Sequence, residues 1–177
     1  MLIKSRMGMS VDGFVANADG VPAIALAAGF EPGQSHGFPE FIAGSDAVVM
    51  GRNTFVPALG AGGWPWPGLQ VYVLTTRPLP DGTPADVIAV PDPAALAEAL
   101  RARDSGGDVH LVGGPRTIRA FSDIGALDQL EIVLLPMLLG SGVPLSPPGA
   151  PALPLRLLRA DRRFPDGSVE VSYTLGN

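Results

Sequence analysis

A glycine pair between an apolar run and a proline is the part of this sequence best suited to hold a ligand. Residues 109–112 favour a strand, Gly113 and Gly114 follow, and Pro115 can open a helix. Glycine lets a backbone approach a ligand closely, and proline suits a first helical position because its missing N–H is not needed there. The free N–H groups of such a helix start bind phosphate. Arg116, in the first turn, is disfavoured by the helix dipole unless an anion lies nearby; an ordinary turn with a solvated arginine explains the same residues.

Two further strand-like segments end in junctions that could also hold a ligand. The apolar residues 46–50 run into Gly51 and a helix-like segment, and the strand-like residues 69–74 run into Thr75. Because ligands of parallel sheets bind beyond the carboxyl ends of the strands, we expect three junctions, at Gly51, Thr75 and Gly113, to line one cleft. An arginine accompanies each junction: Arg52, Arg77 and Arg116.

Strand and helix patterns alternate along the chain and predict an α/β fold with a largely parallel sheet. The proline, aspartate and glycine at 165–167 favour a hairpin that adds antiparallel strands at one edge. Residues 17–37 are expected to form a long loop. The expected strands are 2–9, 46–50, 69–74, 87–90, 109–112, 130–135 and two within 153–175; the expected helices are 38–44, 93–103 and those that begin near 52 and 115.

Composition excludes several classes of function. The length of 177 residues fits one domain, expected over residues 1–177. The net charge of −5 and the lack of a basic cluster argue against nucleic acid as a partner. No run is apolar enough to span a membrane and no signal peptide is evident, so we expect a cytoplasmic protein. With no cysteine and only two histidines, we expect no metal site.

Several motifs occur together in a fixed order. They are Met9-Ser10-Val11-Asp12-Gly13-Phe14-Val15-Ala16, Val49-Met50-Gly51-Arg52-Asn53-Thr54-Phe55, Trp64-Pro65-Trp66-Pro67, Val73-Leu74-Thr75-Thr76-Arg77, Val112-Gly113-Gly114-Pro115 and Pro136-Met137-Leu138-Leu139-Gly140-Ser141-Gly142-Val143-Pro144-Leu145. In order and spacing they resemble the dihydrofolate-reductase-like family that includes the reductase domain of bacterial riboflavin biosynthesis. The resemblance covers nearly the whole chain.

The resemblance implies a mostly parallel twisted sheet of about eight strands flanked by helices, NADPH as cofactor, and a homodimer. By resemblance, the backbone of Met9 meets the nicotinamide carboxamide. The resemblance also implies that Gly51, Arg52 and Thr54 hold phosphates and that Thr75, Thr76 and Arg77 lie near the adenosine. The residues implied to hold the pyrophosphate are Gly113, Gly114, Pro115, Arg116 and Thr117. Because the arginine fork suits phosphate, we expect a preference for the cofactor that carries the 2′-phosphate.

The implied activity is hydride transfer from NADPH to a small organic substrate. Asp12 is the candidate catalytic group, as a proton relay or substrate acceptor; a turn-forming aspartate before glycine explains it as well. The chain departs from its relatives at Val112, Gln129 and Ser146, and without cysteine it has no zinc deaminase part. We therefore expect a stand-alone reductase for a pterin-like, ribosylaminopyrimidine-like or other carbonyl or imine substrate. The alternative is an NADP(H)-binding or sensing protein without turnover.

Overall fold

The computed structural model describes residues 1–60, 65–103 and 106–175 of the chain. In chain order the elements are β1 (Ile3–Ser10), β2 (Phe14–Ala16), the 3₁₀ helix η1 (Ala23–Leu26), α1 (Phe38–Ile42), β3 (Ser45–Gly51), α2 (Arg52–Leu59), β4 (Gln70–Leu74), β5 (Ile88–Val90), α3 (Pro93–Arg101), β6 (Asp108–Gly113), α4 (Pro115–Asp123), β7 (Gln129–Leu135), β8 (Val143–Pro144), β9 (Leu155–Arg163) and β10 (Val169–Leu175). Within these residues, no helix is long and apolar enough to cross a membrane.

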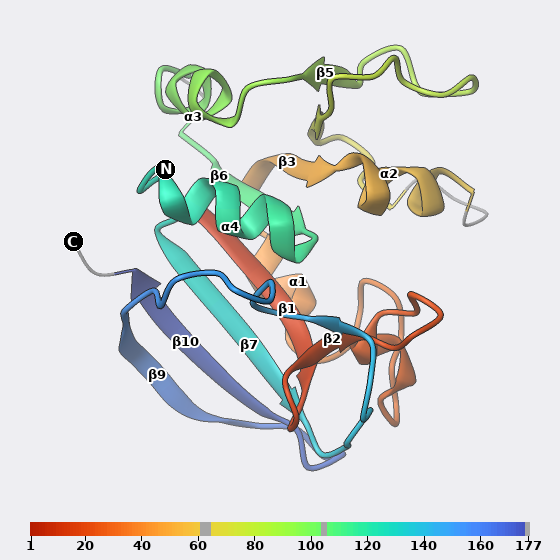
Figure 1. The fold of residues 1–177 in the computed structure, drawn as a ribbon, viewed down its shortest axis with the longest axis vertical. Helices are drawn as coiled ribbons and strands as arrows, with labels where there is room; N and C mark the ends of the chain where they lie inside the picture. Colours follow the sequence, from red (N-terminus) through yellow and green to blue (C-terminus); the bar gives the residue numbers. More distant parts are fainter. Residues whose placement is uncertain (61–64, 104–105, 176–177) are drawn as a thin grey trace. The chain divides into compact units, whose positions relative to one another are not determined.

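The main sheet has eight strands in the order β5-β4-β3-β6-β1-β7-β10-β9 (Figure 1). The pairs β4–β5, β3–β4, β3–β6 and β1–β6 are parallel. Strand β10 pairs antiparallel with both β7 and β9. The predicted α/β fold, with its mostly parallel sheet and antiparallel C-terminal hairpin, is therefore confirmed.

The chain forms two compact units. The first comprises residues 1–5 and 44–128, and the second comprises residues 6–43 and 129–177. The residues of β1 up to Ser5 belong to the first unit, and those from Arg6 onward belong to the second. One domain over residues 1–177 stays a prediction. All three strand-to-helix or strand-to-turn junctions singled out in the sequence belong to the first unit.

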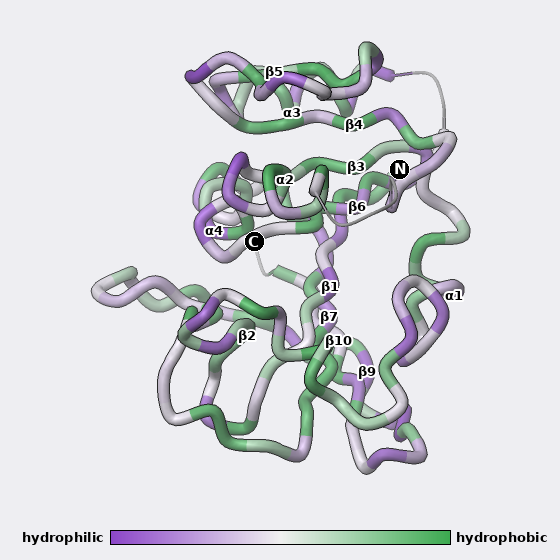
Figure 2. Tube along the Cα trace, turned by 90° about the vertical axis from the view of Figure 1, so that its right-hand side faces the viewer, coloured by the Kyte–Doolittle hydropathy of each residue, from purple (hydrophilic) through white to green (hydrophobic). Residues whose placement is uncertain are grey.

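Strand β3 of the first unit is buried on both faces. Residues 47–50 are fully buried, as expected for a central parallel strand, and Figure 2 colours β3 and β4 mainly as hydrophobic. Trp66 packs into the core beside these strands, whereas Trp64 lies outside the described residues. The buried members of this core are Val48, Met50, Phe55, Trp66, Val71, Val73 and Val87.

Helix α3 shows how local sequence signals define an element. The carboxylate of Asp92 accepts a hydrogen bond of 2.8 Å from the backbone N–H of Ala94, and Pro93 occupies the first helical position. Leu96 and Leu100, one turn apart, are both buried. The helix ends at Arg101, two residues before the predicted end at 103, within the ordinary uncertainty of a helix boundary.

Residues 17–37 of the second unit were expected to form a loop, and this expectation is wrong in part. They contain η1, whose first residue, Ala23, is fully buried against β7 together with Ala27, Val133 and Leu135. The chain can pass there only because β1 has a glycine: a Cβ on Gly8 would lie 2.6 Å from Cβ of Ile24. No local sequence pattern predicts this contact between β1 and η1.

Strand β9 is an edge strand whose register against β10 shifts twice. Arg162 lies opposite Glu170, and Arg159 lies opposite Ser172. Residues directly opposite each other in a sheet share a face, so both arginines lie on the face of Glu170. In a regular strand, two residues three apart would point to opposite faces.

Candidate functional site

Three neighbouring strands of the first unit end at one edge of the sheet. Strands β4, β3 and β6 pair in parallel, so their carboxyl ends share that edge. Helix α2 begins directly after β3, α4 begins after β6, and residues 75–77 follow β4. The structure thus brings together the predicted residues of the first unit, namely Gly51, Arg52, Thr54, Thr75, Thr76, Arg77, Gly113, Gly114, Pro115, Arg116 and Thr117.

The starts of α2 and α4 contact each other through glycine and threonine. A Cβ on Gly51 would lie 2.7 Å from Oγ1 of Thr117, and a Cβ on Gly114 would lie 3.7 Å from Oγ1 of Thr54. Thr117 is the third residue of α4, whereas Gly51 precedes α2. Thr54 is the third residue of α2, whereas Gly114 precedes α4. Gly113 has a φ of +113°, a conformation that favours glycine. Both helix starts therefore depend on residues without side chains.

Neither helix has a side-chain cap at its N-terminus. Gly51 and Gly114 occupy the cap positions, and neither first turn carries an acidic residue. Helix α3 differs, since Asp92 caps it. In the first turn of α4, Pro115 has no N–H, and the N–H of Thr117 donates to the carbonyl of Gly114 at 2.9 Å. First-turn N–H groups that lack an intrahelical acceptor lie at the positive end of the helix dipole. Two such starts side by side favour an anion at this edge.

Arginine side chains add positive charge beside these helix starts. Nη1 of Arg52 donates a hydrogen bond of 2.6 Å to the carbonyl of Pro78, which links α2 to the segment after β4. That segment is held by Thr75, whose Oγ1 accepts a 3.0 Å hydrogen bond from the N–H of Arg77. Among the described residues, the ion pairs include none formed by Arg52, Arg77 or Arg116. Their charges are thus available to a ligand.

Asp12 lies in the second unit, in the turn after β1, and its carboxylate binds backbone. The N–H groups of Leu139 and Gly140 donate to it at 3.1 and 2.7 Å. A hydrogen bond with the side chain of Ser10, followed by those from Gly140 and Leu139, outweighs desolvation and lowers the pKa of Asp12. The carboxylate thus stays ionised and fixes the Leu139–Gly140 turn; a catalytic role stays a prediction. Met9 lies half-buried near the end of β1 in the same unit.

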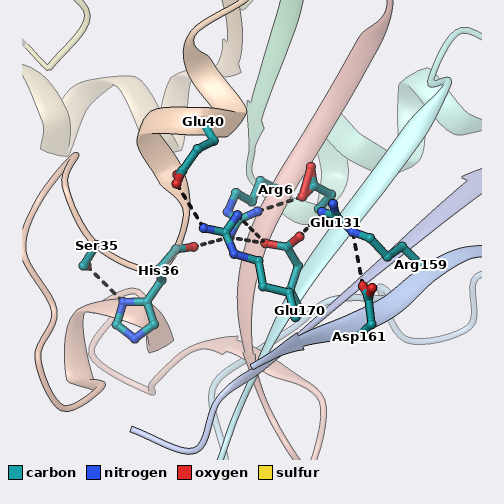
Figure 3. A network of polar contacts seen from close by, with 9 residues as sticks. Arg6, Ser35, His36, Glu40, Glu131, Arg159, Asp161 and Glu170 are labelled. Carbon is teal, nitrogen blue, oxygen red and sulfur yellow. Dashed lines mark hydrogen bonds and ion pairs between the residues drawn. The ribbon is translucent and has the colours of Figure 1, made fainter. Parts of the chain in front are cut away.

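The second unit also contains a buried charge network that sequence reasoning missed (Figure 3). Arg6, at 6% side-chain exposure, forms ion pairs of 2.7 Å with Glu131 and 2.9 Å with Glu170. Glu170 is fully buried and also pairs with Arg159 and, at 3.8 Å, with Arg162. The sequence signal that could have indicated this network is the alternation of residues along β10, which places Glu170 on the same face as the buried Ser168 and Ser172. Among the described residues, no three His, Cys, Asp or Glu side chains gather to hold a metal ion.

Asp166, in the turn between β9 and β10, gives a prediction about acid stability. Burial raises its pKa, but hydrogen bonds from the hydroxyl and N–H of Ser168 and from His36 outweigh this and lower it from 3.8 to about 2. A carboxyl whose pKa is depressed on folding stabilises the fold above its unfolded value, and this stabilisation is lost as the pH falls through the folded value. We expect Asp166→Asn to lower the free energy of unfolding at pH 7 by about 2 kcal/mol.

The measurement is urea unfolding from pH 7 down to pH 2. The wild type should lose this contribution between about pH 4 and pH 2, and Asp166→Asn should lose correspondingly less over the same range. The exposed Asp19→Asn serves as the control. An Asp166→Asn profile parallel to that of the wild type would contradict the assignment.

Fold and site together define an α/β protein with an anion-favouring edge at the carboxyl ends of its parallel strands. The chain belongs to the RibD C-terminal domain family, whose pattern matches residues 2–166. The family resemblance found in the sequence is thereby confirmed. The chain is also 29% identical, over 142 residues, to the uncharacterized protein YwjB of Bacillus subtilis strain 168, covering 78% of this chain and 79% of that one.

Solved structures share the fold. A protein of Shewanella sp. PV-4, described as a riboflavin biosynthesis protein, is 25% identical with a TM-score of 0.82, and the match covers 100% of both chains. RibD of Acinetobacter baumannii is 17% identical with a TM-score of 0.74; the match covers 99% of this chain and 58% of that one. A Thermotoga maritima deaminase and reductase is 14% identical with a TM-score of 0.71, and the match covers 99% of this chain and 56% of that one.

Proposed function

We propose that this chain is an NADPH-dependent reductase that transfers hydride to a small organic substrate. The observation that carries the proposal is the sheet edge where two uncapped helix starts meet three arginines that have no carboxylate partner among the described residues. Family membership supports a reductase, because the Thermotoga maritima relative is described as a 5-amino-6-(5-phosphoribosylamino)uracil reductase. The proposed substrate is pterin-like, ribosylaminopyrimidine-like or another carbonyl or imine compound.

The residues at this edge fit a dinucleotide that carries phosphates. Gly51 lets the two helix starts lie against each other, since a Cβ there would lie 2.7 Å from Oγ1 of Thr117, and two adjacent helix starts suit a diphosphate. Arg52 and Arg116 would neutralise its charge, and Arg77 would hold the 2′-phosphate. When bound, the nicotinamide ring supplies the hydride. The residues of the chain would bind and orient the nucleotide and exclude water.

The test is a fluorescence titration with NADPH and with NADH. The wild type should bind NADPH more tightly than NADH, and Arg52→Ala should weaken NADPH binding by roughly 10- to 150-fold, since one charge-assisted hydrogen bond contributes roughly 1.5–3 kcal/mol. Arg119→Ala is the matched control: it removes the same charge from the body of α4, where Arg119 pairs with Asp123 at 2.7 Å. Binding of neither nucleotide would overturn the proposal. Equal affinity for NADH would overturn the phosphate role of the arginines.

A second candidate function is NADP(H) binding or sensing without turnover. The observation that favours it is Asp12, whose carboxylate is already held by two backbone N–H groups and thus is poorly placed to donate a proton. The two candidates differ in one measurement. A reductase consumes NADPH absorbance when a reducible pterin or ribosylaminopyrimidine is added, whereas a sensor binds NADPH and leaves its absorbance constant.

A further inference from the structure

The positive charges of the first unit divide into two groups. Of its seven lysine and arginine residues, Arg52, Arg77 and Arg116 lie at the proposed nucleotide edge. The other four form ion pairs with aspartates: Lys4 with Asp108 at 3.0 Å, Arg101 with Asp128 at 2.8 Å, Arg103 with Asp46 at 2.6 Å and Arg119 with Asp123 at 2.7 Å. The phosphates of the nucleotide occupy the three edge arginines in the proposed function. Among its described residues, the first unit therefore keeps no unpaired cation for a second phosphorylated ligand.

The second unit has its five arginines in two places. Arg6 is buried in the charge network, where it pairs with Glu131 and Glu170 (Figure 3). The other four all lie on β9: Arg156, Arg159, Arg162 and Arg163. Strand β9 is the outermost strand of the sheet and is separated from β1 by β7 and β10, which at the usual strand spacing is about 14 Å. A single sugar is shorter than this distance, so a phosphate attached to a sugar at the end of β1 would not reach these arginines.

The remainder of the second unit is acidic. Residues 6–43 and 129–154 contain five acidic residues, and Arg6 is their only lysine or arginine. These segments include Met9 near the end of β1 and the turn that carries Asp12. A phosphate that moved from water into this part of the protein would meet negative charge and no available cation, and an uncompensated loss of its hydration is costly.

Backbone N–H groups can bind a phosphate in place of cations, and the turn at Leu139 and Gly140 has a suitable shape. Two successive N–H groups converge there, and Gly140 has a φ of +70°, which is typical of an anion-binding turn. The carboxylate of Asp12 already accepts both N–H groups, at 3.1 and 2.7 Å. Asp12 is thus an internal anion that fills this turn and repels a second anion. The start of α1 is no substitute, because its first turn carries Glu40.

We propose that the substrate of this chain carries no phosphate, and that the carboxylate of Asp12 excludes phosphorylated compounds by filling the Leu139–Gly140 turn. This inference rests on the proposed function, in which Met9 is expected to meet the nicotinamide and the substrate binds beside that ring. Unphosphorylated pterins, ribosylaminopyrimidines and small carbonyl or imine compounds fit, whereas their phosphate esters do not. The Thermotoga maritima relative, by contrast, is described as a reductase of a phosphoribosyl compound.

Ribose 5-phosphate is the probe, and the broadening of its phosphorus NMR resonance reports binding without turnover. The free protein should broaden the resonance, because the phosphate binds at the unoccupied nucleotide edge, and saturation with NADPH should remove the broadening. Arg116→Ala should weaken binding to the free protein, whereas Arg156→Ala, which removes an exposed arginine from β9, should not. Broadening that persists with NADPH bound would overturn the inference and leave the proposed function intact. Failure of NADPH itself to bind would instead contradict the proposed function.

Asp12→Asn tests whether Asp12 causes the exclusion. The amide keeps an oxygen for the turn, removes the negative charge and adds an N–H donor. With NADPH bound, this variant should bind ribose 5-phosphate about tenfold more tightly than the wild type, because like charges no longer face each other. Asp19→Asn removes an exposed carboxylate from the same unit and should behave like the wild type. If NADPH-bound Asp12→Asn binds the probe no better than the wild type, the role assigned to Asp12 is wrong.

Discussion

A Glu170→Gln variant will unfold about 3 kcal/mol more easily than the wild type, because it breaks a buried ion pair and leaves Arg6, Arg159 and Arg162 with Glu131 as the buried carboxylate that remains in the network. Glu170 is fully buried and pairs with Arg6, Arg159 and Arg162. Arg159 and Arg162 can turn toward water, but Arg6, at 6% side-chain exposure, cannot. For a chain of this length the loss corresponds to a melting temperature lower by roughly 6–12 °C, measurable by circular dichroism.

The control for this variant is Glu40→Gln on α1. Glu40 also pairs with an arginine of the network, Arg162, but its side chain is 66% exposed. Exposed ion pairs contribute little to stability, so this variant should melt like the wild type. If Glu170→Gln melts together with Glu40→Gln, the buried network does not stabilise the second unit as described.

A Gly51→Ala variant will bind NADPH about tenfold more weakly, a change of ~1.4 kcal/mol. The new Cβ would lie 2.7 Å from Oγ1 of Thr117, closer than real Cβ atoms approach another atom. Thr117 is in the first turn of α4, so relieving the contact displaces one helix start relative to the other. The proposed phosphate site requires both starts in place. Nucleotide titration measures the loss, and thermal melting of the same sample shows that the variant is folded.

Gly44→Ala is the matched control, because it makes the same substitution in the same unit. There the nearest atom to the added Cβ, a carboxylate oxygen of Asp108, lies at an ordinary 3.9 Å. This variant should bind NADPH like the wild type. Wild-type affinity in a folded Gly51→Ala protein would show that nucleotide binding does not depend on the contact with Thr117.

Local sequence signals predicted much of the first unit. Apolar runs predicted β3 and β6, and the helix expected from Pro93 begins there as α3. The glycines at 51 and 113 predicted strand ends followed by helix starts, and both occur there. These elements could be predicted because each depends on residues close together in the sequence, through backbone dihedrals, capping and burial of one face.

The second unit was less predictable, because its polar groups meet across long separations. Arg6 and Glu131 are 125 residues apart, and His36 and Asp166 are 130 apart. A sequence shows that Glu170 alternates with apolar residues, but not which arginines reach it. Asp12 illustrates the same limit: its Asp-Gly pair predicted a turn, yet the partners that hold its carboxylate, Leu139 and Gly140, lie in a distant turn.

The two register shifts in β9 have a consequence for how this protein behaves at high concentration. An edge strand offers unpaired N–H and C=O groups to any passing strand, and a straight, apolar edge promotes aggregation. Here the extra residues interrupt the regular spacing of those groups, and Arg156, Arg159 and Arg162 line one face of the strand. Without the shifts, the exposed Leu157 and Leu158 would lie on an even edge. The irregular β9 is therefore a poorer template for edge-to-edge pairing than a regular strand of the same residues.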